Sequence, residues 1–136
     1  MAIDELLTSI ADWAAQHDEI VGIALVGSHA RSEATSESDV DLIVLTGDLH
    51  SQLGDRSWLA EFGEVLSVTL EQWGMVASLR VQYQDGPEVE FGIAPVRWAW
   101  TEPVDRGTRD VVRRGMRILY DPNEVLGVLA DAVSSQ

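Results

Sequence analysis

The chain has 136 residues, a hydrophobic content of 46% and a formal net charge of -14 at pH 7. This length suffices for one domain with one core. The negative charge disfavours nucleic acid as a partner, because such binding depends on Lys and Arg contacts to phosphate. The sequence contains no cysteine, which excludes disulfides and thiolate metal sites. No apolar run approaches the roughly 20 residues of a membrane helix, and the first residues lack a signal-peptide pattern, so we expect a cytoplasmic protein without membrane contact.

The first half of the chain alternates helical and strand-like segments. Residues 3–17 place apolar side chains at helical spacing, which predicts an amphipathic helix. Residues 20–26 are apolar and rich in β-branched types, as in a buried strand. A short helix is expected over 28–34, a second strand over 41–45, and a modest helix within 48–63.

The second half contains further strand-like runs followed by helices. Strands are expected over 65–70, 77–83 and 89–94, a helix over 108–114, and a short strand or connector over 118–120. Asp121 and Pro122 predict the start of a final helix that continues to Val133. This order indicates an α/β fold, a single domain over 1–136 with a mixed sheet of about five strands flanked by helices.

The first candidate site residues lie where the first strand ends. Gly27 lets the backbone approach a ligand closely, and the amides at the start of the next helix are unpaired and suit phosphate. The Ser28 hydroxyl can add a hydrogen bond. Taken alone, Gly27 and Ser28 favour an ordinary strand-to-helix turn.

Two carboxylates one residue apart open the second strand. Side chains two residues apart in a strand point to the same side, so Asp39 and Asp41 would face one way while Val40, Leu42 and Val44 face the core. Carboxylate oxygens at that separation suit a divalent cation such as Mg²⁺. The alternative is a pair of exposed acids at a strand end, but the Gly27-Ser28 turn just upstream favours the functional interpretation.

A third acid is expected on a later strand. In the run 88–93, acids and glycine alternate with apolar residues, so Val89, Phe91 and Ile93 would pack inward and leave Glu88 and Glu90 on the opposite face. Glu90 joins the cluster if its strand neighbours the one that carries Asp41. The alternative is the polar outer face of a half-exposed edge strand.

These residues together resemble the signature of the nucleotidyltransferase superfamily, the DNA polymerase beta-like enzymes. The matching positions are Gly27, Ser28, Arg31, Ser38, Asp39, Asp41 and Leu42. The segment 115–122 is similar to the C-terminal part of small bacterial members related to antibiotic adenylyltransferases. Ser32 departs from the family pattern, where glycine commonly follows the arginine, and Glu90 stands where aspartate is commoner.

The resemblance implies the transfer of a nucleoside monophosphate, expected to be AMP from ATP, to a hydroxyl of a small-molecule acceptor with release of pyrophosphate. It implies two Mg²⁺ ions held by Asp39 and Asp41, with Glu90 as a metal ligand or as the general base. Gly27 and Ser28 would hold the β and γ phosphates. Arg31 and Ser38 complete the set of implied nucleotide-binding residues.

Other functions remain open at this point. The chain has little room for the helical domain that shapes the acceptor site of many antibiotic-modifying relatives, and a homodimer could supply the missing wall. A minimal, antitoxin-type nucleotidyltransferase that binds or modifies a partner protein also fits the small size and acidic surface. A nucleotide-binding module without catalysis is the third alternative.

Arginine and tryptophan side chains give weaker signals. Five arginines near the C-terminus could approach the triphosphate or bind an acidic partner, although pairing with Asp105 and Asp110 or a solvated face is favoured; they are Arg106, Arg109, Arg113, Arg114 and Arg117. Two tryptophans could line a nucleobase or acceptor pocket, with the core or a subunit interface favoured; they are Trp98 and Trp100. The remaining tryptophans are assigned to the core or its edge: Trp13, Trp58 and Trp73.

Overall fold

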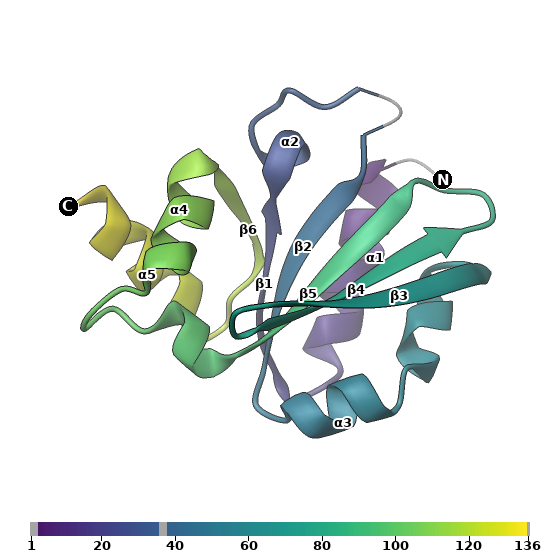
Figure 1. Cartoon of the computed structure of the whole chain (residues 1–136), viewed down its shortest axis with the longest axis horizontal. Helices are drawn as coiled ribbons and strands as arrows, with labels where there is room; N and C mark the ends of the chain where they lie inside the picture. Colours follow the sequence, from purple (N-terminus) through teal and green to yellow (C-terminus); the bar gives the residue numbers. More distant parts are fainter. Residues whose placement is uncertain (1–2, 36–37, 136) are drawn as a thin grey trace.

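A twisted six-stranded sheet with helices on both faces forms the body of the protein (Figure 1). The computed structural model describes residues 3–35 and 38–135. The strand order is β3-β4-β5-β2-β1-β6. Strands β2 and β5 are parallel, and all other neighbours are antiparallel. The predicted α/β fold with a mixed sheet and flanking helices is therefore confirmed, with six strands instead of about five.

The elements follow the predicted order along the chain. The strands are β1 (Ile20–Val26), β2 (Val40–Thr46), β3 (Val65–Trp73), β4 (Val76–Tyr83), β5 (Glu88–Pro95) and β6 (Met116–Tyr120). The α-helices are α1 (Ile3–Ala15), α2 (Gly27–Ala30), α3 (Leu49–Gly54), α4 (Arg106–Arg114) and α5 (Val125–Ser134). Two 3-10 helices complete the fold: η1 (Ser57–Phe62) and η2 (Val96–Ala99).

One face of the sheet is closed by α1, α3 and η1, with α1 behind the strands in Figure 1. The alternating apolar residues of β2 and β5 are buried against these helices, as predicted for Val89, Phe91 and Ile93. An aromatic cluster fills the centre of this core. Trp58 stacks on Trp13 with ring centroids 5.0 Å apart and meets Phe91 edge-on at 5.2 Å. We call this side the closed face.

The other face is covered only in part, by η2, α4 and α5 over β1, β2 and β6. Ile43 and Leu45 of β2 belong to this second core, together with Leu126 and Leu129 of α5. The sequence-based assignment of Val40, Leu42 and Val44 to the core is thus correct but incomplete, because β2 is buried on both sides. Over β3, β4 and the beginning of β5 the same face carries polar side chains. We call this side the open face.

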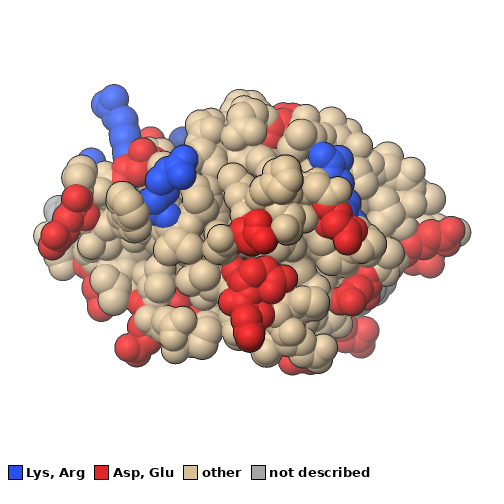
Figure 2. All heavy atoms as spheres, turned by 90° about the horizontal axis from the view of Figure 1, so that it is seen from below, with Lys and Arg blue, Asp and Glu red and all other residues tan. Residues whose placement is uncertain are grey.

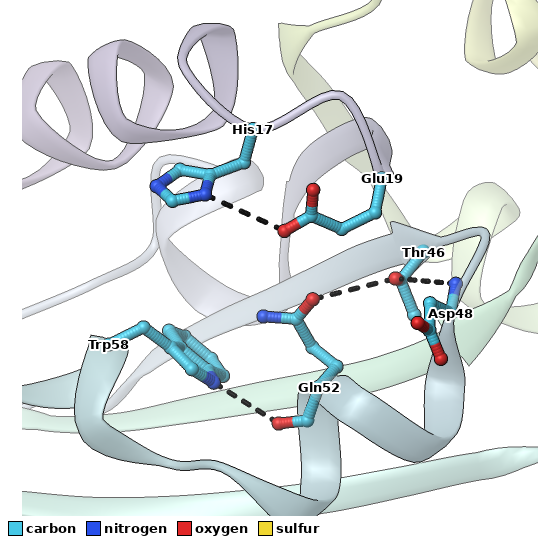
Figure 3. A network of polar contacts seen from close by, with 6 residues as sticks. All are labelled: His17, Glu19, Thr46, Asp48, Gln52 and Trp58. Atoms are coloured by element: carbon cyan, nitrogen blue, oxygen red, sulfur yellow. Dashed lines mark hydrogen bonds and ion pairs between the residues drawn. The ribbon is translucent and has the colours of Figure 1, made fainter.

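Polar contacts fix α3 below the end of β2 (Figure 3). The Asp48 amide donates to Thr46 Oγ1 at 3.1 Å, and Trp58 Nε1 donates to the Gln52 carbonyl oxygen at 3.1 Å. Nearby, the Gly47 amide donates to the Glu19 carbonyl oxygen at 2.8 Å. These bonds anchor the end of β2 that lies away from Asp41.

Several local predictions need correction. The first short helix, α2, covers Gly27–Ala30 instead of 28–34. The final helix begins at Val125, because Asp121 reaches forward and accepts hydrogen bonds from the amides of Leu126 and Gly127 at 3.0 and 2.8 Å. The assignment of Trp73 to the core or its edge is wrong: its exposed fraction is 61%, since it stands at the tip of the β3–β4 hairpin.

Candidate active site

The strand order brings Asp41 and Glu90 together on the open face. In the parallel pairing of β2 with β5, Asp41 lies directly opposite Glu90, so their side chains point to the same side. The Glu90 carboxylate is close enough to Asp41 to raise the pKa of Asp41. This is the juxtaposition that the sequence predicted on condition that the two strands are neighbours.

Asp41 is half-buried and electrostatically strained. Burial, followed by the neighbouring Glu90 and Asp39 carboxylates, raises the pKa of Asp41 from its ordinary 3.8 to about 6, against an opposing effect of Arg80. Carboxylates held this close repel each other unless a proton or a cation lies between them. The site therefore favours uptake of positive charge next to Asp41.

Gly27 makes room for this carboxylate. Its φ of 73° lies in the left-handed region that favours glycine, and a Cβ at this position would collide with Asp41 Oδ2. Ser28 follows in the half-buried first turn of α2. The sequence had only predicted a close backbone approach to a ligand, and the structure shows that the first close neighbour is the catalytic candidate itself.

Asp39 lies near both Asp41 and Glu88. It precedes β2, is exposed, and contributes to the raised pKa of each of these groups, after burial in both cases. The expectation that Asp39 and Asp41 extend from one strand is thus only partly met. Within 3–35 and 38–135, no three acidic or histidine side chains already form a cation cage. Asp39 would have to move closer to Asp41 and Glu90 to complete one.

Two residues that sequence reasoning missed fix Glu90 in place. The Ser78 hydroxyl donates to Glu90 Oε1 at 2.5 Å, and Arg80 Nη2 lies 3.7 Å from Glu90 Oε2. Both come from β4, where Arg80 lies opposite Glu90. Residues 78–82 alternate between polar and apolar types as β5 does, which indicates a strand with one polar face. That Ser78 and Arg80 contact Glu90 follows only when β4 and β5 are known to be neighbours.

The remaining predicted nucleotide residues lie around α2. Arg31 lines the site cavity and is held by Glu33, whose carboxylate oxygen is 3.1 Å from its Nε. Ser38 Oγ accepts a hydrogen bond from the Thr35 amide at 2.9 Å, so its hydroxyl closes the loop before β2. Ser32 has a φ of 59°, which explains why glycine is common at this position in the family pattern.

A cavity of about 720 Å³ extends from α2 to the β3–β4 hairpin. Near α2 it is lined by Gly27, Arg31, Asp41 and Glu90, and farther along by Trp73, Val76, Gly92 and Trp98. Trp98 is buried, in line with the favoured core assignment, and Trp100 is 64% exposed elsewhere. Of the five C-terminal arginines, Arg114 lines the cavity. Asp105, a predicted partner of these arginines, caps α4 by accepting a hydrogen bond from the Thr108 amide at 3.1 Å.

Charge is unevenly spread over the surface. Figure 2 shows carboxylates spread over the left, centre and right of one face, while the arginine side chains form a few separate groups, most of them on the left, the side on which α4 and α5 lie in Figure 1. Among the described residues, no helix is long and apolar enough to cross a membrane.

Comparison with known proteins agrees with this geometry. A family model described as streptomycin adenylyltransferase matches residues 2–131. No curated protein sequence matches. Among solved structures, the chain is similar to an aminoglycoside 6-adenyltransferase from Bacillus subtilis, with a TM-score of 0.59 and 18% sequence identity. The match covers 73% of this chain and 37% of that one, so it supports the fold, and this chain corresponds to about a third of that protein.

Proposed function

Because the chain belongs to the streptomycin adenylyltransferase family, we propose that it is a Mg²⁺-dependent nucleotidyltransferase that transfers AMP from ATP to a hydroxyl of a small-molecule acceptor. The family supports nucleotidyl transfer. The use of Mg²⁺, of ATP and of a small-molecule hydroxyl acceptor is what we propose beyond it. The observation that carries it is the pairing of Asp41 with Glu90 beside Gly27, in one cavity with Arg31.

The residues fit a hard divalent cation. Carboxylate oxygens are the ligands that Mg²⁺ prefers, and the raised pKa of Asp41 shows a carboxylate in need of a counter-charge. Asp41, Glu90 and a reoriented Asp39 would hold the metal, and we expect two Mg²⁺ ions. Glu90 receives the ligand role because Ser78 and Arg80 fix its carboxylate opposite Asp41. Bound Mg²⁺ would offset the negative charge of the triphosphate and activate the acceptor hydroxyl.

The protein's own groups orient the substrates. Gly27, Ser28 and Arg31 would bind the β and γ phosphates, so that the α-phosphate lies over Asp41 and Glu90. The acceptor oxygen then forms a bond to the α-phosphorus while the bond to the bridging oxygen breaks and pyrophosphate leaves. The half-buried setting of Asp41 strengthens these electrostatic interactions relative to bulk water.

A pyrophosphate-release assay with ATP, Mg²⁺ and a panel of hydroxyl-bearing acceptors, starting with aminoglycosides, tests the proposal. We expect release with at least one acceptor, and a loss of at least about a hundredfold in Asp41→Asn, since metal-assisted charge stabilisation is worth several kcal/mol. Asp12→Asn makes the same charge change on an exposed side chain of α1 and should match the wild type. Undiminished release by Asp41→Asn would refute the assigned role.

A further inference from the structure

The part of the cavity away from the carboxylates has a different chemistry. There it is lined by the β3–β4 hairpin on one side and by α4 on the other. In Figure 1 the turn between β3 and β4 reaches toward the side of the molecule that carries α4. We call this part the hairpin slot and define it by Trp73, Val76, Gly92 and Val111, which are all cavity-lining residues.

Gly92 leaves space at the base of the hairpin slot because it has no side chain. A Cβ on Gly92 would lie 3.1 Å from both Ile43 Cδ1 and Val76 Cγ1, and 3.0 Å from the Leu42 carbonyl oxygen. Any side chain at this position would therefore stand up between Ile43 and Val76 and fill the slot. With glycine there, the floor consists of backbone and flat aliphatic surface, which suits the face of a ring.

Trp73 supplies an aromatic wall. Its exposed fraction of 61% is large for a tryptophan, although the side chain lines the cavity. An indole ring offers a wide apolar face, and covering that face releases free energy roughly in proportion to the area removed from water. A planar ring placed against Trp73 would gain this free energy without displacing any core residue.

The direction of the hairpin slot indicates which ring enters it. The phosphate end lies at Gly27 after β1, and the open face continues across Asp41 in β2 and Glu90 in β5 to Arg80 in β4. In phosphoryl transfer the attacking and leaving oxygens are roughly in line. With pyrophosphate on the β1 side, the acceptor approaches from the β4 side, along this row across the sheet.

The hairpin slot runs at right angles to that row, along the strands. It follows β2 from Asp41 to Ile43 and β5 from Glu90 to Gly92. The third substituent of the α-phosphate, the nucleoside, has to leave the line between the attacking and leaving groups. The slot is the part of the cavity that receives it.

We propose that the nucleobase of the nucleoside triphosphate lies in the hairpin slot and stacks on Trp73, with Gly92 and Val76 beneath it. This inference rests on the proposed function and assigns the base-binding residues that the family signature does not include. It makes Trp73 a binding residue for the nucleotide without a part in the chemical step.

Calorimetric titration of the whole chain in Mg²⁺ tests it with two probes, a non-hydrolysable ATP analogue and inorganic tripolyphosphate, which has no base. Stacking of a base on an aromatic side chain is worth about 1–3 kcal/mol, so Trp73→Ala should weaken analogue binding about 5- to 150-fold and leave tripolyphosphate binding unchanged. Trp73→Phe keeps a ring and should lose less. Trp100→Ala removes an equally exposed tryptophan outside this cavity and should bind both probes like the wild type.

A second variant changes the wall of the hairpin slot that α4 forms. Gly107 lines the cavity from α4, and a Cβ there would lie 3.2 Å from Asp105 Oδ2, so Gly107→Leu adds a side chain to this wall and requires a small shift of that carboxylate. It should also weaken the analogue selectively. Unchanged analogue affinity in Trp73→Ala, or an equal loss for both probes, overturns the inference alone, as does a raised acceptor KM with unchanged nucleotide affinity. Failure of the wild type to bind either probe overturns the proposed function and this inference together.

Discussion

The two faces of the sheet use the same strands for opposite purposes. On the closed face, Phe91 of β5 is fully buried between Trp58 and Phe62. One residue away, on the open face, Glu90 of the same strand stands half-exposed beside Asp41. Alternation along a strand therefore separates the side chains that stabilise the fold from those that form the site, and the first set can be rigid while the second carries unfavourable charge.

The largest expected effect is on the closed face. Phe91→Ala removes a ring from a fully packed aromatic core and should lower the free energy of unfolding by about 3–5 kcal/mol. Denaturant unfolding monitored by circular dichroism measures it. Leu66→Ala, a control at a side chain 60% exposed, should change stability by less than about 0.5 kcal/mol. Similar values for the two variants would contradict the account of the closed face.

Gly27→Ala probes the open face through its backbone. The left-handed φ of 73° costs a non-glycine residue about 1–2 kcal/mol, and the new methyl group also displaces the Asp41 carboxylate. We expect a modest loss of stability with a larger loss of pyrophosphate release. Gly54→Ala is the matched control, since no atom lies within 4 Å of its added Cβ; full activity in both variants would refute the close approach.

Helix α5 covers part of the open face and is held by Asp121. Asp121→Ala removes the acceptor for the amides of Leu126 and Gly127 and should cost about 1 kcal/mol, as for a helix cap. Thermal unfolding measures the change. Asp121→Asn retains a side-chain oxygen and should lose less, so an equal loss in both would mean that the charge matters instead of the hydrogen bonds.

A pH dependence of stability is also expected from the open face. The folded-state pKa of Asp41 lies above its ordinary 3.8, so the protonated carboxyl stabilises the metal-free protein at low pH, and this contribution is lost as pH rises through about 6. In EDTA, the wild-type melting temperature should therefore fall more than that of Asp41→Asn between about pH 5 and pH 7.5. An equal change of melting temperature with pH in the two proteins would contradict the raised pKa of Asp41.

The fold was largely predictable because its signals are local. The apolar run 20–26 predicted a buried strand, and the alternation in 88–93 predicted a strand with Val89, Phe91 and Ile93 facing inward; both are observed. Helix α5 was placed too early because Asp121 caps it from four residues before its first residue, a geometry that spacing alone does not distinguish from a direct N-cap.

The arrangement of the candidate site was predictable only in part. The sequence predicted that Asp41 and Glu90 would meet if their strands were neighbours, and the pairing of β2 with β5 meets this condition. The contacts of Ser78 and Arg80 with Glu90 were not predicted, because they depend on the order of strands in the sheet. Asp39 was expected to extend from the same strand as Asp41, yet β2 begins only at Val40. Trp73 was misassigned because an aromatic residue at the end of a strand has the same local pattern whether the hairpin tip is covered or open.

The most direct test of the central claim is the binding of a divalent cation to the paired carboxylates, measured by calorimetry with Mn²⁺ at neutral pH. We expect binding to the wild type and to Asp12→Asn, and at least about tenfold weaker binding to both Asp41→Asn and Glu90→Gln. Equal affinity in all four proteins would contradict the assignment of Asp41 and Glu90 as the metal-binding pair.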